Sequence, residues 1–418
     1  MTSIANPFGA FFDRSLSQMT DLRGSIIVIL LWWIIGPAFA SIPFMLQGAP
    51  TINAYFEAVS ALTTTGGWLS PEAVWQNASG MIWRAVLQWM GGLASISIAA
   101  AIFIRPAFIG IDTLLPPFSR GDRDSYLHAI REAVGAFVGV YLLLTLICFI
   151  CLMIADAPVL DGLVMALSMI ASGGMIPNEK SVLGYAFPVV GVLLPFMVLG
   201  GANFILLTRS VLGVSSRNRD TETGIYLAAI FIVGVIFWIA AGAGDLDLIP
   251  AQIFNAASLF STNGVLIGDG PTLPLALVTV IIGGSAVSAA GGFKILRWLV
   301  IIRRAREEIR LLVVPRGVFR KPTVANELGV WVHFLVFTLI LASMTLIIAL
   351  AGHEFELSVT TAISVLANAG PVIAVADGGS DFSVFSGPLK LILCLGMILG
   401  RLEAVVALAI FNAAFWRS

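Results

Sequence analysis

Four short segments of this chain share one pattern of small and polar residues that ends at a glycine. When the glycines are aligned, an alanine stands eight residues earlier, a serine six earlier, a large apolar residue four earlier and a small polar residue two earlier. The aligned glycines are Gly66, Gly174, Gly264 and Gly370, which are spaced about one hundred residues apart. An internal repeat of this kind indicates one structural unit used four times. The alternative is four unrelated helix ends that contain glycine and serine.

Glycine and small neighbours suit a loop whose backbone carbonyls turn towards an ion. Glycine reaches backbone conformations that are closed to other residues, and carbonyl oxygens from four loops can replace the hydration shell of a permeating cation. The loops carry no Asp or Glu, which favours a weakly hydrated monovalent cation over Ca²⁺ or Mg²⁺. We predict that the ion is coordinated by Thr64, Thr65, Gly66, Ser172, Gly173, Gly174, Thr262, Asn263, Gly264, Asn368, Ala369 and Gly370.

The composition places these loops in a membrane protein. Of the 418 residues, 58% are hydrophobic and only 11% are charged, and the mean hydropathy is +0.98. Soluble domains carry about 25% charged residues. The net charge of −1 offers no attraction for nucleic acid.

Eight apolar runs are long enough to cross a bilayer, for which about 20 residues are needed. They lie at Ser25–Leu46, Met81–Ile104, Ala129–Ile154, Gly184–Leu207, Gly224–Ala243, Leu273–Ile302, Val330–Ala351 and Leu389–Phe415. Within each successive pair lies a shorter apolar piece that ends at an aligned glycine and is typical of a re-entrant helix. We therefore predict an all-α polytopic membrane protein with four membrane–pore–membrane repeats around a pseudo-fourfold pore. The predicted units are an N-terminal cytoplasmic or interfacial segment at 1–24 and repeats at 25–110, 120–215, 222–310 and 325–418.

The distribution of Lys and Arg predicts how the chain is oriented in the membrane. Most of the 23 Lys and Arg residues lie in segments on the side opposite the glycine loops, and such basic segments face the cytoplasm. Both termini are then cytoplasmic. The basic stretch Arg303–Lys321 is either a topology signal alone or a docking surface for a cytoplasmic partner.

The sixth apolar run is the one in which we expect a broken helix. It contains Gly283, Gly284, Gly291 and Gly292, and each glycine weakens a helix by about 1 kcal/mol relative to alanine. Non-helical backbone at this depth needs protein or a water-filled cavity around it, so we predict a flexible loop beneath the pore. The alternative is close packing of helices through small residues. Lys294 and Arg297 are expected to extend to the cytoplasmic interface.

Charged residues inside the apolar segments are further candidates. Arg401 stands in the last run, where a charge is costly and marks a pathway or an ion pair. It either faces the pore and repels cations, or pairs with Glu403 or another acid. Glu57 and Asp161, on the first two short helices, are either exposed at the outer mouth or paired locally.

These motifs together resemble the Trk/Ktr/HKT superfamily of potassium transporters, and within it the membrane (pore) subunit of bacterial Trk. The resemblance covers residues 25–418 and rests on EAVSALTTTGG, ASGG, STNG, NAGP, GGSAVSAAGGFK and GRLEAVVALAIFNAAFWR. It implies K⁺ coordination by the four glycine loops, gating by the loop Gly283–Gly292 and by Arg401, and a homodimer in the bacterial inner membrane. It also implies a cytoplasmic nucleotide-binding regulatory subunit. Larger members have an extra N-terminal helix pair, which we do not expect before Ser25.

Other functional classes of membrane protein fit the sequence less well. A less selective Na⁺/K⁺ channel or symporter remains the main alternative function. An alternating-access carrier would show inverted halves and two broken helices, whereas four parallel quarters and one broken helix are expected here. The sequence has no HExxH motif, intramembrane Asp pair or Ser/His dyad, so we do not expect an enzyme.

Overall fold

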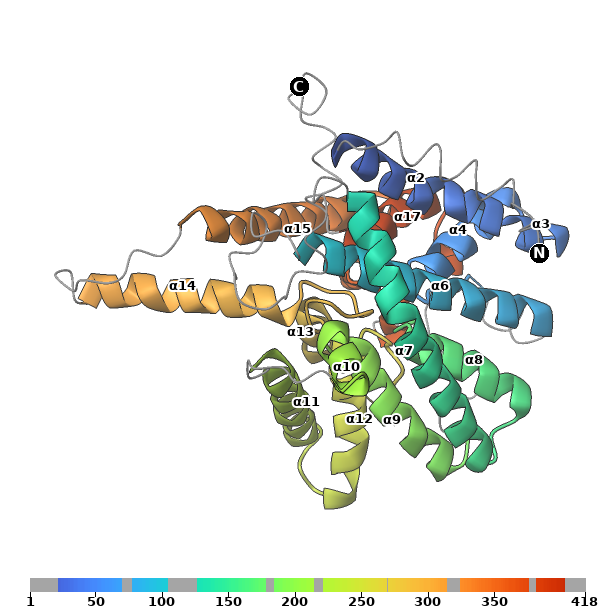
Figure 1. Ribbon diagram of the computed structural model, residues 1–418, viewed down its shortest axis with the longest axis horizontal. Helices are drawn as coiled ribbons and strands as arrows, with labels where there is room; N and C mark the ends of the chain where they lie inside the picture. The colour runs from blue at the N-terminus through green and yellow to red at the C-terminus, as the bar shows by residue number, and fades with distance from the viewer. Residues whose placement is uncertain are drawn as a thin grey trace, which may run out of the picture.

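The computed structural model describes residues 22–69, 77–103, 126–177, 184–213, 221–268, 270–313, 324–375 and 381–402. In these ranges the chain is mainly helical (Figure 1). Most of the predicted N-terminal segment, Arg316, Arg320 and Lys321 of the basic stretch, and everything from Glu403 onward, including the rest of the predicted last span, lie outside the described residues.

Helices make up most of each described range. The longer ones are α2 (Leu22–Ala40), α6 (Ala78–Phe103), α7 (Tyr126–Ile154), α9 (Phe187–Gly201), α11 (Thr221–Ala240), α14 (Ile295–Val313), α15 (Val324–Leu350) and α17 (Gly387–Arg401). The shorter ones are α3 (Ile42–Leu46), α4 (Thr51–Leu62), α8 (Val159–Ile170), α10 (Phe204–Val211), α12 (Ile249–Phe260), α13 (Leu273–Ile282) and α16 (Phe355–Leu366). Three 3₁₀ turns complete the described elements: η3 (Leu246–Leu248), η4 (Gly370–Val375) and η5 (Phe382–Val384).

Within the described residues, four helical stretches are long and apolar enough to cross a membrane. They are Ile27–Leu46, Ala133–Ile154, Thr221–Ala240 and Gly329–Leu350. A fifth span is formed if α9 and α10 are taken together, although they are bent by 110°. The other three predicted spans correspond to α6, to the broken pair α13 and α14, and to α17, whose apolar run continues beyond the described residues.

The bend between α9 and α10 corrects the expectation of a single broken helix. The backbone carbonyls of Gly200 and Gly201 accept N–H bonds from Ala289 and Ser285 in the segment between α13 and α14. Phe204 N–H in turn donates to the Val287 carbonyl at 2.7 Å. The bonds that would have continued α9 are thus made with a segment more than 80 residues away in the sequence. The sequence pattern did not indicate this second break because its partners are distant.

The four 12-residue helices are packed in a cyclic order. Each contacts helices of its own quarter and one long or broken helix of the preceding quarter: α4 contacts α17, α8 contacts α6, α12 contacts α9, and α16 contacts α13. The last quarter is thereby joined to the first. Figure 1 shows α14 and α15 extending together away from this centre.

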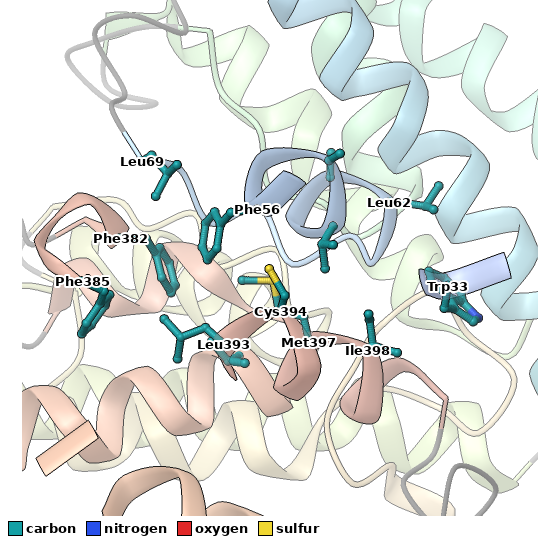
Figure 2. Close-up of a cluster of buried hydrophobic side chains, with 14 of the residues drawn as sticks. Trp33, Phe56, Leu62, Leu69, Phe382, Phe385, Leu393, Cys394, Met397 and Ile398 are labelled. Atoms are coloured by element: carbon teal, nitrogen blue, oxygen red, sulfur yellow. The ribbon is translucent and has the colours of Figure 1, made fainter. Parts of the chain in front are cut away.

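A buried apolar cluster joins the first and last quarters of the described chain. Phe56 and Leu62 of α4 pack in one core with Phe382, Leu393 and neighbouring residues of the last quarter. Figure 2 shows these side chains converging between α4 and α17. Van der Waals packing of this kind holds helices together inside a membrane, so the junction between the last quarter and the first is a packed interface.

Candidate functional site

The four aligned segments fold into four helices of equal length. α4, α8, α12 and α16 each have 12 residues, and each ends four residues before its aligned glycine. The C-terminal end of a helix carries a partial negative charge of about half an elementary charge. All four of these ends lead directly into a glycine loop, so the loops lie in a potential that favours a cation.

Each helix also ends with the same backbone motif. The residue two before the aligned glycine is left-handed in all four cases, with φ of 55° at Thr64, 58° at Ser172, 55° at Thr262 and 52° at Asn368. The next N–H bonds the carbonyl of the repeated serine: Thr65 to Ser60, Gly173 to Ser168, Asn263 to Ser258 and Ala369 to Ser364, at 2.8–2.9 Å. This is the Schellman ending of a helix. A left-handed residue other than glycine costs about 1–2 kcal/mol, and strain of this kind is typical of functional sites.

The glycines themselves are not equivalent. Gly66, Gly174 and Gly264 are left-handed, with φ of 68°, 63° and 70°. Gly370 instead begins η4, and its φ lies outside that region. Pro371 follows it and has no N–H. In the first two loops the corresponding N–H, that of Gly67 or Met175, donates to the hydroxyl of the repeated serine at 2.8 Å.

The four loops touch one another in a closed ring. A Cβ atom added to Gly66 would lie 2.2 Å from the Gly173 carbonyl oxygen, and one on Gly174 would lie 1.7 Å from that of Asn263. The corresponding atom on Gly264 would meet the Pro371 ring at 3.1 Å. Gly370 closes the ring, because its N–H donates to the Thr65 carbonyl at 2.6 Å. First, second, third and fourth loops are therefore neighbours in that order.

Side chains reinforce two of these junctions. Asn263 accepts a bond from Gly174 N–H through Oδ1 at 3.0 Å. Asn368 donates through Nδ2 to the Thr65 hydroxyl at 3.0 Å and to the Met397 carbonyl of α17 at 3.0 Å. All twelve predicted loop residues are buried and none has a carboxylate. The ligands that this ring can offer to an ion are thus the oxygen atoms of carbonyls, hydroxyls and amides.

The predicted glycines of the sixth apolar run do break the helix. α13 ends at Ile282 and α14 begins at Ile295, and Gly283 and Gly292 between them are left-handed, with φ of 72° and 76°. Gly291 reaches the ring itself, since a Cβ there would lie 1.9 Å from the Ala367 carbonyl oxygen. Gly284 packs closely against Ala290 and the Gly201 carbonyl. We call residues 283–294 the intramembrane loop.

Lys294 corrects one expectation. Instead of extending to the interface, it is buried and folds back on the intramembrane loop, where Nζ binds the carbonyls of Ser288 and Ala290 and the Ser288 hydroxyl. Arg297 is also buried, and its Nη1 donates to the Phe293 carbonyl at 3.1 Å. Both side chains therefore stabilise the turn into α14.

Arg401 lies across a small cavity from the intramembrane loop. Its Nε donates to the Ser95 hydroxyl of α6 at 2.5 Å, and its Nη2 is buried without a hydrogen-bond partner. The cavity is lined by Arg401, Ser95, Ser288, Gly291, Lys294 and neighbouring residues. Its volume of about 30 Å³ is enough to hold water, for which a cavity of roughly 10–15 Å³ is needed.

The two acids on the short helices are paired locally. Glu57 accepts from Arg84 Nε at 2.9 Å and from Leu69 N–H at 3.1 Å, and it is buried. Asp161 accepts from the Tyr185 hydroxyl at 2.8 Å. Of the two alternatives for these acids, local pairing is therefore observed.

Some residues that shape the site were not singled out from the sequence. Gln88 of α6 donates to the Gly173 carbonyl at 2.9 Å. Glu222 at the start of α11 accepts from Ala286 N–H of the intramembrane loop at 2.6 Å and from Asn203 Nδ2 at 2.9 Å. Gln88 is a polar residue inside the apolar run Met81–Ile104, and Glu222 stands just before the run Gly224–Ala243. Polar residues at such positions are the feature of the sequence that could have identified both. Gly173 is 85 residues from Gln88 and Ala286 is 64 residues from Glu222 along the chain.

The chain is similar to known proteins along most of its length. Residues 14–227 match the model of the TrkH family, described as a cation transport protein. The Trk system potassium uptake protein TrkH of Salmonella typhimurium is 27% identical over 97% of this chain and 88% of its own length. TrkI of Halomonas elongata, also named a Trk system potassium uptake protein, is 28% identical over 94% of this chain and 83% of its own.

A solved structure has the same fold. The crystal structure of the potassium transporter TrkH from Vibrio parahaemolyticus matches with a TM-score of 0.80, over 94% of this chain and 86% of that one, at 24% identity.

Proposed function

This chain belongs to the TrkH family of cation transport proteins, and from that premise we propose that it takes up potassium ions across the cell membrane. Membership also makes it a multi-pass helical membrane protein and a transporter, not an enzyme. The relatives named above are potassium uptake proteins, which supports K⁺ as the transported ion of this chain.

The observation that carries the proposal is the closed ring of four loops. Each loop leaves a helix of 12 residues, begins with a left-handed residue and touches the next loop in order. In the proposed pseudo-fourfold pore, carbonyl oxygens of residues up to Gly66, Gly174, Gly264 and Gly370 replace the water shell of K⁺. The absence of carboxylates from these positions suits a monovalent cation.

We assign the gate to the intramembrane loop and Arg401. The loop lies against the ring at Gly291, and Arg401 faces the same small cavity. A guanidinium charge there repels a cation by Coulomb forces that are strong away from bulk water. Opening then requires the loop and Arg401 to separate, so that the cavity enlarges and fills with water.

The assembly and setting of the chain follow from the resemblance to Trk proteins. We propose a homodimer in the bacterial inner membrane, controlled by a cytoplasmic nucleotide-binding subunit. Arg209 and the arginines of α14 lie on the side opposite the glycine loops in the proposed topology, and both termini are then cytoplasmic.

Uptake of radioactive Rb⁺ into proteoliposomes that contain the full chain tests the proposal. Competition by K⁺ and not by Na⁺ is expected, and Gly66→Ser should weaken that preference. Gly213→Ser is the matched control, because Gly213 has the same left-handed φ of 68° but no atom within 4 Å of an added Cβ.

Equal competition by Na⁺ in the wild-type chain would favour the alternative, a less selective Na⁺/K⁺ channel or symporter. If the wild type is silent, Arg401→Ala should open the path without a partner. Silence of both proteins in liposomes and of the wild type in cells would overturn the proposal.

A further inference from the structure

Gln88 lies at the junction of the first two loops. It is fully buried within α6, and its Nε2 donates to the Gly173 carbonyl of the second loop at 2.9 Å. The same Nε2 lies 3.5 Å from the position of an added Cβ on Gly66. The amide therefore contacts the ring at the residue that precedes the second aligned glycine.

Gly173 and Gln88 are complementary in shape. A Cβ on Gly173 would lie 2.4 Å from Cδ, 2.6 Å from Oε1 and 2.7 Å from Nε2 of Gln88. Gly173 has no left-handed φ, so glycine is required there for space and not for backbone conformation. The other three loops have Thr65, Asn263 and Ala369 at this position. In the second loop the side chain of Gln88 occupies the space that these residues fill with their own.

The glutamine is peculiar to the first quarter. In α6, α9 and α17 one glycine packs against the last carbonyl of the short helix of its own quarter: Gly91 against Leu62, Gly200 against Ile170 and Gly400 against Leu366. Three residues before these glycines, α6 has Gln88 whereas the other two helices have Met197 and Met397. The protein itself therefore accepts methionine at the corresponding place.

We propose that Gln88 is a positioning residue that fixes the Gly173 carbonyl and thereby contributes to the choice of K⁺ over Na⁺. This inference rests on the proposed function. Selectivity of a carbonyl ring depends on how many carbonyls coordinate the ion and how readily they move inward around a smaller one. A carbonyl held by a buried amide donor is less free to approach Na⁺, because breaking that bond leaves the buried Nε2 donor of Gln88 unsatisfied.

The decisive variant is Gln88→Met, which keeps the volume and removes the donor. Radioactive Rb⁺ uptake is measured in bacterial cells that lack their own potassium uptake and express the full chain, with external K⁺ or Na⁺ as competitor. We expect the K⁺ preference over Na⁺ to fall about tenfold or more while the Rb⁺ uptake rate stays within about twofold, since the ring keeps its other contacts. A merely structural role would lower the rate and leave the ratio of competition unchanged.

A pair of variants tests the fit between Gln88 and Gly173. Gly173→Ala alone should reduce uptake by about tenfold or more, because the new Cβ overlaps the amide. Adding Gln88→Ala makes room, so the double variant should regain uptake but with the lowered K⁺ preference of Gln88→Met. Elution profile and melting temperature in detergent establish that each variant folds.

The results separate the two levels of inference. A wild-type chain without selective uptake overturns the proposed function and this inference with it. Unchanged selectivity in Gln88→Met, against a selective wild type, overturns this inference alone, as does failure of Gln88→Ala to restore uptake to Gly173→Ala.

Discussion

Two glycines of the ring should respond very differently to the same added methyl group. Gly174 and Gly264 are both left-handed, with φ of 63° and 70°, so alanine at either position costs about 1–2 kcal/mol of backbone strain. At Gly264 the new Cβ would lie 3.1 Å from a Pro371 ring atom, which a small shift relieves. At Gly174 it would lie 1.7 Å from the Asn263 carbonyl oxygen and 2.7 Å from its carbon.

The overlap at Gly174 is with backbone, which cannot rotate away. The second and third loops must separate, and overpacking of this kind costs about 1–3 kcal/mol more. The Gly174 N–H bond to Asn263 Oδ1 is also lost, at about 0.5–1.5 kcal/mol. Gly174→Ala should therefore cost roughly 2.5–6.5 kcal/mol against about 1–2 for Gly264→Ala.

The assay is Rb⁺ uptake with K⁺ or Na⁺ as competitor, together with the melting temperature in detergent. Gly264→Ala should still transport with a K⁺ preference, whereas Gly174→Ala should lose the preference or the uptake. Gly213→Ala is the control, since it adds the same strain at φ 68° in open space and should leave transport unchanged. Equal behaviour of Gly174→Ala and Gly264→Ala would refute the packing that we derive for the ring.

Three further outcomes follow from local contacts. Arg84→Met should lower the free energy of unfolding by about 3–5 kcal/mol, because it leaves the buried carboxylate of Glu57 without its cationic partner. The melting temperature in detergent measures this loss, and the double variant with Glu57→Gln should regain most of it. Thr262→Val removes the hydroxyl that accepts Gly291 N–H at 2.8 Å. The closed position of the intramembrane loop is then less stable by about 1–3 kcal/mol, so Rb⁺ uptake should rise. Unchanged or slower uptake would contradict this. Tyr185→Phe removes a partly exposed bond to an acid, so it should change the melting temperature little, and a large fall would show that this contact matters more than its exposure implies.

Local features of the sequence predicted much of the architecture. The length of the apolar runs indicated where long helices lie, and the short runs before Gly66, Gly174, Gly264 and Gly370 coincide with four helices of 12 residues. These features are readable because run length and helix-ending residues act within a few positions of one another. The break over residues 283–294 was predicted for the same reason, since clustered glycines weaken a helix locally.

Contacts between distant residues were not predictable in this way. Gln88 and Gly173 are 85 residues apart, and Lys294 turned inward because carbonyls of the intramembrane loop are there to bind it. The bend between α9 and α10 exists because that loop takes up the hydrogen-bonding groups of Gly200 and Gly201. Each of these three features depends on which backbone N–H or carbonyl groups of a distant segment still lack a hydrogen-bond partner.

The sequence by itself therefore determined a helical membrane protein with one loop motif used four times, because apolar run length and helix endings are local properties. Only the tertiary structure decided the cyclic order in which the loops touch and the partners of Gln88, Glu222 and Lys294. It also decided that Gly370, unlike the other three aligned glycines, has no left-handed φ. The physical reason is that hydrogen-bond satisfaction and close packing are settled between segments, once the helices have been brought together.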